Sequence, residues 1–253
     1  MQPQPARTIP VIEPDWPRAL RVRAAMTLRE GGVSKPPFDT LNLGTHVGDD
    51  AAAVSENRRR VRESLGLPRE PAWLEQVHGT QVADLDATDV SKPIRADAAV
   101  TRDVGRVCVI QVADCLPVLL AARDSSVVGA AHAGWRGLAG GVIEATVRAM
   151  NVPASQLLAW LGPAIGPEHF EVGDEVRAAF VRPDPRAASA FTRNERQRWQ
   201  CDLYALAQMR LSALGVQYVS GGGWSTYADA SRFFSYRRDG QCGRMAALIW
   251  IES

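Results

Sequence analysis

The stretch that decides the fold is RVCVIQVADCLPVLLAARDSSVVGAAHAGWRG, residues 106–137. Its CVIQV segment (108–112) is apolar on both faces, which is typical of a central strand that is covered on both sides. We expect strands at Arg106–Val112, Val118–Ala122 and Val127–Ala133, followed by a helix over about Leu138–Met150. The stretch therefore predicts neighbouring buried strands that lead into a helix.

On both sides of this stretch, the sequence predicts more strands and helices without a regular βαβ order. A helix is expected from Asp49 to about Leu65, with Asp49 or Asp50 as its N-cap and Gly66 at its end. Residues 183–198 are interpreted as a polar, Arg-rich connection. The order favours a mixed α+β domain with layered sheets. The other expected elements are strands at Arg21–Leu28, Ala72–Val77, Gln81–Leu85, Ala96–Thr101, Leu157–Leu161, Val216–Val219, Phe233–Tyr236 and Met245–Ile251, and helices at Glu171–Val181 and after the cap Asp202.

Length and composition indicate one ordinary globular domain. The chain has 253 residues, of which 46% are hydrophobic and 23% are charged. Residues 1–17 are rich in proline, so we predict an N-terminal arm over 1–20 and a single catalytic domain over 21–253. The net charge of +1 gives no indication of binding to nucleic acid or to an anionic membrane surface.

The cysteines and the N-terminus indicate a reducing compartment. The four cysteines form no CxxC pair and are too sparse for a disulfide scaffold. The N-terminus lacks the apolar core of a signal peptide. The most apolar stretch, 107–122, is interrupted by Gln111, Asp114 and Pro117, so it is no membrane span. We expect a cytoplasmic protein whose thiols are free to bind metal or to react.

Three candidate metal ligands lie at or just past predicted strand ends: His78, Cys115 and His132. They stand in the segments EQVHG (75–79), VADCLP (112–117) and AAHAGWRG (130–137). Two histidines and a cysteine suit zinc, and three protein ligands leave a fourth position open, as in catalytic zinc sites. Each residue also has an ordinary explanation, as a turn histidine, a buried small side chain or a turn cap. Spacing alone leaves both interpretations open.

The glycine-rich turn after His132 is a candidate anion site. Gly134 allows close approach of the backbone, and Arg136 stands where a helix begins. Phosphate or carboxylate would bind at such a turn; alternatively, the glycines permit tight helix–sheet packing and the arginine is solvated. Arg238 and Arg244 belong to a second basic cluster near the C-terminus, which is either a further anion site or a solvated face.

Several motifs, taken in their order along the chain, resemble the laccase-domain family. Members of that family were first called multicopper polyphenol oxidases and are now described as purine nucleoside phosphorylases or peptidoglycan editing factors. The resemblance runs from about residue 21 to the C-terminus, and VADCLP followed by HAGWRG is its most specific pair. The motifs are LNLGTHVGDD (41–50), LEQVHG (74–79), ADAAVT (96–101), VADCLP (112–117), HAGWRG (132–137), LGPAIGP (161–167) and FFSYRRDGQCGR (233–244).

The resemblance implies a zinc site made of His78, Cys115 and His132, and a four-layer α/β/β/α fold with mixed sheets. Family members are described as cleaving adenosine, inosine and methylthioadenosine with phosphate, and as deaminating adenosine to inosine. We therefore predict a zinc-dependent purine nucleoside phosphorylase with adenosine deaminase activity. Its substrates would be a small-molecule nucleoside and phosphate, the latter held by the arginines and the glycine turn named above. Asp114 would act as a general acid/base or hold a ligand in place.

This chain departs from the family pattern in two places. Trp224-Ser225-Thr226 stands where many members have a Cys-Thr pair, and Cys242 replaces a common threonine before Gly243. Neither position belongs to the three proposed ligands. Any role of that family cysteine, for instance in binding copper, is therefore in doubt here.

Three alternatives to the phosphorylase remain at this stage. In a cysteine hydrolase, Cys115 would be the nucleophile and a histidine the base, with a peptidoglycan precursor as substrate. A copper-dependent polyphenol oxidase would need more histidine ligands, for which His46 and His169 are the only ones left. A zinc-stabilised binding module without catalysis fits an open three-ligand site poorly. The sequence does not distinguish a monomer from a homodimer.

Overall fold

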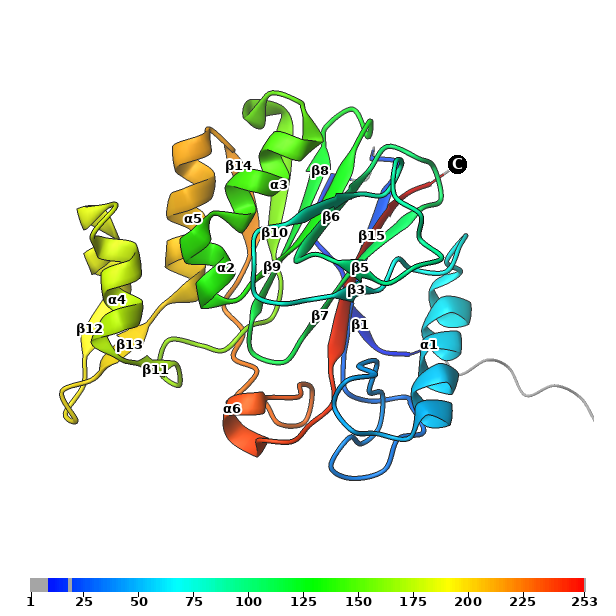
Figure 1. Ribbon diagram of the computed structural model, residues 1–253, viewed down its shortest axis with the longest axis horizontal. Helices are drawn as coiled ribbons and strands as arrows, with labels where there is room; N and C mark the ends of the chain where they lie inside the picture. The colour runs from blue at the N-terminus through cyan, green and yellow to red at the C-terminus, as the bar shows by residue number, and fades with distance from the viewer. Residues whose placement is uncertain (1–8, 18–19, 253) are drawn as a thin grey trace, which may run out of the picture.

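The computed structural model describes residues 9–17 and 20–252, and two main sheets lie face to face at its centre (Figure 1). The first sheet has the strand order β1-β2-β15-β7, and the second has the order β14-β10-β8-β9-β6-β4. The strands of the first are β1 (Val11–Ile12), β2 (Val22–Thr27), β7 (Val107–Val112) and β15 (Met245–Ile251). Those of the second are β4 (Val82–Asp84), β6 (Ala98–Thr101), β8 (Leu116–Ala122), β9 (Val128–Ala133), β10 (Leu157–Leu161) and β14 (Tyr218–Gly221).

Both sheets are covered by helices on their outer faces, which gives four layers. Along β7, Val109 faces the helix α1 (Ala51–Leu65), whereas Ile110 faces the second sheet. Along β8, Leu119 faces the first sheet, and its neighbour Leu120 packs under the helices α3 (Val142–Met150) and α5 (Leu203–Leu214). This alternation follows from the period of two along a strand. The predicted α+β fold with four α/β/β/α layers is confirmed, including the doubly covered strand at 107–112.

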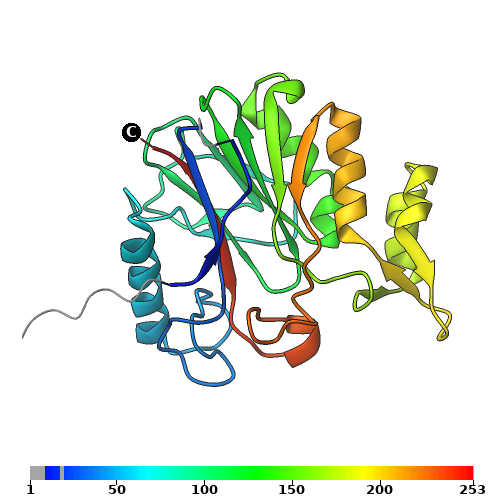
Figure 2. The same cartoon turned by 180° about the vertical axis from the view of Figure 1, so that it is seen from behind.

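The six-stranded sheet is mixed, as predicted, whereas the strand pairs of the four-stranded sheet are all antiparallel. The strand pairs β8–β9, β10–β8 and β15–β7 are antiparallel, whereas β10–β14 and β4–β6 are parallel. A small two-stranded sheet joins β3 (Leu74–Glu75) to β5 (Ile94–Arg95). The described part of the predicted N-terminal arm, 9–17, contributes β1, where Val11 pairs with Thr27 (Figure 2); residues 1–8 and 18–19 lie outside the described residues.

Helix ends follow capping rules, and one predicted helix is divided by a glycine. The Asp50 side chain accepts a hydrogen bond from the Ala52 N–H at the start of α1, and Gly66 ends that helix in the left-handed region at φ 59°. The predicted helix over 138–150 begins earlier and is interrupted. Gly141, at φ 97°, separates α2 (Trp135–Gly140) from α3, because a residue in the left-handed region cannot continue an α-helix.

The segment 171–201 is more ordered than predicted and forms a small lobe at one side of the molecule (Figure 2). The expected helix over 171–181 begins with β11 (Glu171–Val172), and only α4 (Asp174–Val181) is helical. The expected connection over 183–198 contains a 3₁₀ helix (Pro185–Ala190) and β12 (Phe191–Arg193), which pairs with β13 (Trp199–Cys201). Two arginines of the lobe stack on the Trp199 ring: Arg177 of α4 at 4.4 Å and Arg193 of β12 at 5.0 Å from its centroid.

The predicted strand at 233–236 is wrong. Phe233 and Phe234 are buried, but they do not pair with another strand, and the short helix α6 (Tyr236–Asp239) follows. The Phe233 carbonyl accepts a hydrogen bond from the Arg238 side chain, and the Ser235 side chain caps α6. The Phe233 carbonyl is thus hydrogen-bonded to a side chain and not to a neighbouring strand. Within 9–17 and 20–252, no helix is both long and apolar enough to cross a bilayer.

Candidate metal centre

The structure brings His78, Cys115 and His132 together at one end of the second sheet. His78 follows β3, Cys115 immediately precedes β8, and His132 lies near the end of β9. One ligand atom from each residue lies within 4.8 Å of the others. The Cys115 Sγ atom is 3.8 Å from His78 Nε2, and the two imidazole rings are 4.8 Å apart. Exposure rises from the buried His132 through Cys115 to the exposed His78, so the cluster opens to solvent on one side.

A buried carboxylate that we did not single out from the sequence, Asp97, holds this cluster together. Asp97 is fully buried and accepts four hydrogen bonds. Its Oδ1 lies 2.9 Å from His132 Nδ1 and 2.8 Å from the His78 backbone nitrogen. Its Oδ2 accepts from the backbone N–H groups of Val77 and Gly79. Asp97 therefore fixes both the His132 ring and the turn that carries His78, as outer-shell carboxylates do at metal sites.

The electrostatics of the cluster favour a charged carboxylate and a thiolate. Burial raises the pKa of Asp97, but hydrogen bonds from His132, Gly79 and Val77 outweigh it and lower that pKa. Burial likewise raises the pKa of the Cys115 thiol, but the neighbouring His132 and His78 lower it to about 6. Burial lowers the pKa of His132, yet Cys115 and Asp97 raise it to about 9. The thiolate is the form of cysteine that binds metals and reacts as a nucleophile.

The donor set and its spacing fit a metal ion. A tetrahedral zinc ion with bonds of about 2.3 Å to sulfur and about 2.0 Å to nitrogen would place these two atoms about 3.5 Å apart. The observed distance of 3.8 Å between Cys115 Sγ and His78 Nε2 is close to that value. Backbone geometry supports the arrangement, since His78 stands in the left-handed region at φ 60°. The cluster can therefore bind a metal ion without large rearrangement.

Gly134 leaves space beside the ligands, so its replacement is a sharp test. A Cβ atom at position 134 would lie 2.9 Å from Cys115 Sγ and 2.9 Å from His78 Cδ2. We expect Gly134→Ala to displace one ligand and to lower metal affinity by roughly tenfold or more, comparable to the loss of an outer-shell partner. Metal content after dialysis against a graded chelator would measure this effect. Gly66→Ala is the control, because nothing lies within 4 Å of that Cβ and only the backbone strain at a helix end changes.

Asp114 accepts hydrogen bonds on both of its carboxylate oxygens. Its Oδ1 accepts a hydrogen bond of 2.6 Å from the Thr226 hydroxyl, and its Oδ2 accepts one of 2.7 Å from the Arg237 backbone N–H. Both oxygens are thus occupied by partners from the C-terminal segment. The residue stands at φ 90°, a conformation unusual for a side chain other than glycine. These contacts favour the second of the two predicted roles, in which Asp114 holds its neighbour Cys115 in place.

The arginines predicted to bind phosphate occupy different environments. Arg136 is exposed on the short helix α2 and stacks on Trp135, with 4.4 Å from its guanidinium carbon to the ring centroid. Gly137 allows close packing, because a Cβ at this position would lie 2.8 Å from the Gly79 carbonyl oxygen. Arg244 is half-buried and lines a pocket of ≈ 360 Å³ with His46 and Tyr236.

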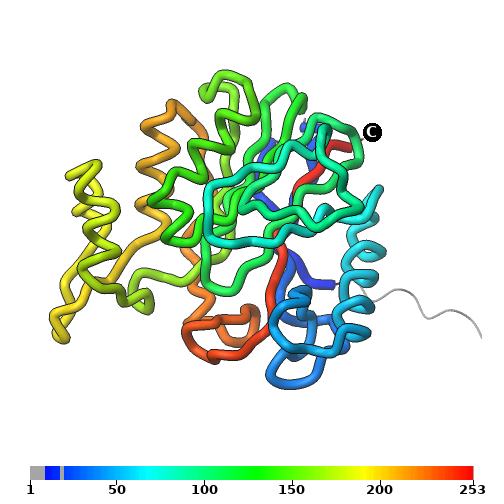
Figure 3. Tube along the Cα trace, viewed as in Figure 1, coloured from blue at the N-terminus to red at the C-terminus, as the bar shows by residue number. Residues whose placement is uncertain are grey.

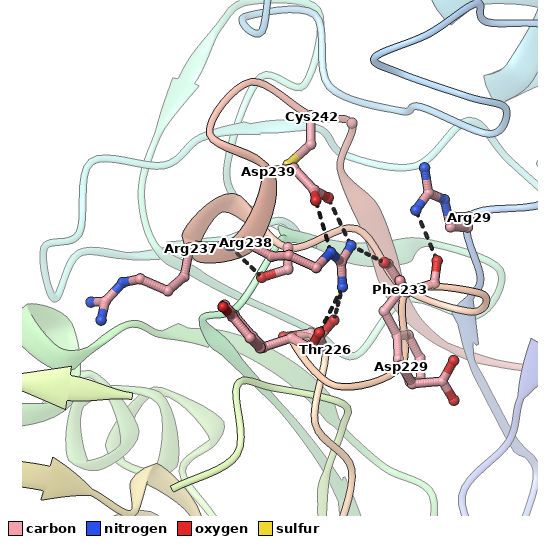
Figure 4. Close-up of polar contacts among 12 residues, drawn as sticks. Arg29, Thr226, Asp229, Phe233, Arg237, Arg238, Asp239 and Cys242 are labelled. Atoms are coloured by element: carbon pink, nitrogen blue, oxygen red, sulfur yellow. Dashed lines mark hydrogen bonds and ion pairs between the residues drawn. The ribbon is translucent and has the colours of Figure 1, made fainter. Parts of the chain in front are cut away.

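Arg238 has a structural role that leaves no donor for phosphate. Its guanidinium donates to the carbonyls of Thr226, Tyr227 and Phe233 and to both carboxylate oxygens of Asp239. Arginine has five N–H donors, and all five are used in these bonds. Figure 4 shows the guanidinium enclosed by these partners, with Arg237 directed away from it. The prediction that Arg238 binds phosphate is therefore corrected: Arg238 stabilises the 226–233 loop through its carbonyl groups.

Removing the Arg238 side chain should destabilise the fold without changing metal content. We expect Arg238→Met to lower the free energy of unfolding by about 2–4 kcal/mol, because three carbonyls and the Asp239 carboxylate lose their donors. Urea denaturation of the metal-loaded protein measures this change. Arg136→Met is the control, with an expected change within about 0.5 kcal/mol, as is usual for exposed positions.

The two departures from the family pattern, at Trp224-Ser225-Thr226 and at Cys242, supply no further ligand to the cluster within the described residues. Ser225 accepts hydrogen bonds from the backbone N–H groups of Gly166 and Ala228 and lies 3.4 Å from His169 Nδ1. Cys242 lines the same pocket as Arg244. Among the described residues, the three-residue cluster is the only group of histidine, cysteine or acidic side chains arranged to hold a metal.

With this geometry in place, comparison with known proteins identifies the class. Residues 23–252 match the model of the multi-copper polyphenol oxidoreductase laccase family, so the chain belongs to that family. It is similar to a Pseudomonas aeruginosa protein named purine nucleoside phosphorylase, with 53% identity over 95% of this chain and 98% of the relative. The purine nucleoside phosphorylase YfiH of Escherichia coli is 48% identical over 95% of this chain and 98% of its own length.

Solved structures share the same fold. The Neisseria meningitidis protein NMB0706 superposes with a TM-score of 0.92 at 46% identity, covering 96% of this chain and 99% of the other. YlmD from Geobacillus stearothermophilus gives a TM-score of 0.89 at 32% identity, over 99% of this chain and 98% of the other. The expected family resemblance is therefore confirmed over nearly the whole chain.

Proposed function

We propose that this chain is a zinc-dependent purine nucleoside phosphorylase that acts on adenosine, inosine and methylthioadenosine and also deaminates adenosine. The observation that carries the proposal is the His78, Cys115 and His132 cluster, which is closed at its buried histidine and open at its exposed one. The names of the full-length relatives support the reaction class. Phosphorolysis moves the sugar from the base to phosphate, so negative charge develops on the departing base.

The residues of the cluster have distinct roles in this proposal. Nitrogen and sulfur donors favour zinc over the hard cations, and a zinc ion held by them would supply a Lewis acid to the purine. Asp97 occupies Nδ1 of His132, so Nε2 is the nitrogen left to face the cluster. The Asp97 bonds to the 77–79 backbone keep His78 at the open side, where a nucleoside can enter. Asp114 holds the turn that presents Cys115.

One assay separates the two activities. The protein is purified without added metal, its zinc and copper are measured, and adenosine is followed with and without phosphate. Adenine that forms only with phosphate supports phosphorolysis, and inosine that forms without phosphate supports deamination. If the zinc-loaded protein forms neither adenine nor inosine, the proposal is contradicted.

A second candidate function rests on the same residues without metal. Asp97, His132 and Cys115 are arranged as a carboxylate, an imidazole and a thiolate in sequence, as in Cys–His–Asp hydrolases. This arrangement would serve a hydrolase that cleaves an amide bond in a peptidoglycan precursor. Chelation distinguishes the two: a hydrolase of this kind keeps its activity when metal is removed, whereas the proposed phosphorylase loses it.

A copper oxidase receives less support from the geometry. The spare histidines, His46 and His169, lie elsewhere: His46 in the pocket with Arg244, and His169 stacked on Tyr227 with ring centroids 4.5 Å apart. Multicopper chemistry would need more histidine ligands than the described cluster supplies. Equal binding of copper and zinc, with oxidation of a phenol by the copper form, would favour that alternative.

A further inference from the structure

A pocket of ≈ 360 Å³ lies between the 42–48 loop and the C-terminal segment that carries α6. We call it the Arg244 pocket; its wall includes His46, Tyr236, Gln241, Cys242 and Arg244. Figure 3 shows these two segments side by side at one end of the molecule, although they are almost two hundred residues apart in sequence. The volume is in the range of small-molecule sites, roughly 300–1,000 Å³.

The pocket presents positive charge without a carboxylate in its wall. Among the described residues, no Asp or Glu lines it. The Arg244 guanidinium uses only Nη1 for hydrogen bonds, to the Cys242 and Gly243 carbonyls, and within the described residues Nε and Nη2 make none. Burial lowers the pKa of His46, and the nearby positive charges of Arg244 and Arg58 lower it further. Arg238 nearby differs, since its donors are all used.

The facing loop holds the Arg244 backbone and lies against the stem of its side chain. The Arg244 N–H donates to Asn42 Oδ1, and the Leu43 N–H donates to the Arg244 carbonyl. A Cβ at Gly44 would lie 2.8 Å from Arg244 Cγ, so glycine there lets the loop lie directly against the arginine stem. A fixed guanidinium with free donors is preorganised for a phosphate group.

A hydrogen bond links the segment that lines the pocket to the turn that carries Cys115. Tyr236 lines the pocket, and its neighbour Arg237 donates its backbone N–H to Asp114 Oδ2. Asp114 in turn directly precedes Cys115. One hydrogen bond and short chain segments therefore connect the two sites through α6.

We infer that the Arg244 pocket binds the phosphate group of the phosphorolysis reaction, as orthophosphate on entry and as the sugar phosphate on exit. This inference rests on the proposed function and identifies its second substrate site. It also assigns the phosphate to Arg244 and His46 instead of the exposed Arg136. The exposed Tyr236 ring offers an apolar face for the sugar beside the charged groups.

Calorimetric titration of the zinc-loaded full chain with orthophosphate alone tests the inference. We expect Arg244→Gln to weaken phosphate binding by about tenfold or more, because a charge-assisted hydrogen bond is lost. His46→Gln should weaken it less, and Arg136→Gln should leave it unchanged. Adenosine 5′-phosphate, titrated in parallel, distinguishes a site for a nucleotide phosphate from one for orthophosphate: tighter binding of the nucleotide would overturn the orthophosphate assignment.

Kinetics and folding controls complete the test. In Arg244→Gln, the KM for phosphate should rise by a similar factor while zinc content and thermal midpoint stay close to wild type. If that variant fails to fold, His46→Gln carries the test alone. The inference is overturned if both His46→Gln and Arg244→Gln bind phosphate as tightly as the wild type. It is also overturned if Arg136→Gln loses phosphate binding. Both outcomes count even if phosphorolysis is observed. If the wild type shows no phosphorolysis but binds phosphate in a way that depends on Arg244, the proposed function is contradicted. The anion site is then still supported.

Discussion

Cys115→Ala is expected to remove both metal binding and nucleoside activity. The Cys115 thiolate is one of the three proposed ligands, and its removal leaves two histidines, one of them exposed. Activity should fall by more than the roughly 10–100-fold cost of losing an outer-shell partner. Zinc should also cease to stabilise the protein, whereas a bound ion at a thousand times its Kd stabilises the wild-type fold by about 4 kcal/mol. Metal analysis and thermal unfolding with and without zinc measure these effects.

Cys201→Ala is the matched control for this substitution. Cys201 is buried in the core of the six-stranded sheet and helices, and burial raises the pKa of its thiol, so it is no candidate ligand. We expect it to lower stability modestly and to leave zinc content unchanged. If Cys115→Ala loses activity while the wild type keeps its activity after chelation, the metal is dispensable and the thiol acts as a nucleophile. Full nucleoside activity in Cys115→Ala would contradict both mechanisms.

The strand-end placement of the ligands could be predicted from sequence because apolar runs are local signals. The runs at 107–112, 116–122 and 128–133 are buried throughout, so their boundaries mark where side chains meet the end of a sheet. The helix over 51–65 was predictable for the same reason, with its cap and its terminal glycine. The break at Gly141 was not, because a glycine inside a helical pattern is often tolerated.

The roles of the arginines could not be predicted, because they depend on backbone partners distant in sequence. Arg238 binds carbonyls at 226, 227 and 233, while Arg244 keeps donors free. Nothing in their types or spacing separates the two. The lobe over 171–201 was missed for a related reason: its hairpin is short, polar on one side and stabilised by arginines stacked on Trp199.

Asp97 did leave a signal in the sequence that went unused. It stands between alanines at the start of the apolar motif ADAAVT, where a carboxylate would be buried. A buried charge requires partners, so it indicates a functional or positioning role. The structure supplies those partners from two other segments, the 77–79 turn and His132. Sequence could indicate that Asp97 matters, but only the fold shows what it holds.

Replacing that carboxylate is expected to affect stability and metal affinity together. In Asp97→Asn, one carboxylate oxygen becomes an NH₂ group. At the Oδ2 position it would face the N–H groups of Val77 and Gly79, and at the Oδ1 position it would face the N–H of His78. We expect the free energy of unfolding to fall by about 3–5 kcal/mol, as when a buried charged network loses a partner. Zinc affinity should fall by roughly 10–100-fold, because His132 Nδ1 loses its charged acceptor.

Denaturation of the metal-free protein and chelator competition of the zinc-loaded protein measure the two effects separately. Asp84→Asn is the control on the neighbouring strand β4: its carboxylate is exposed and pairs with Arg102, so a change within about 0.5 kcal/mol is expected. A folded Asp97→Asn with wild-type zinc affinity would mean that the carboxylate only closes the 77–79 turn. A loss of zinc affinity in an Asp97→Asn variant that remains folded would instead place Asp97 in the proposed metal centre, because zinc then reports on the His132 ring and not on the fold as a whole.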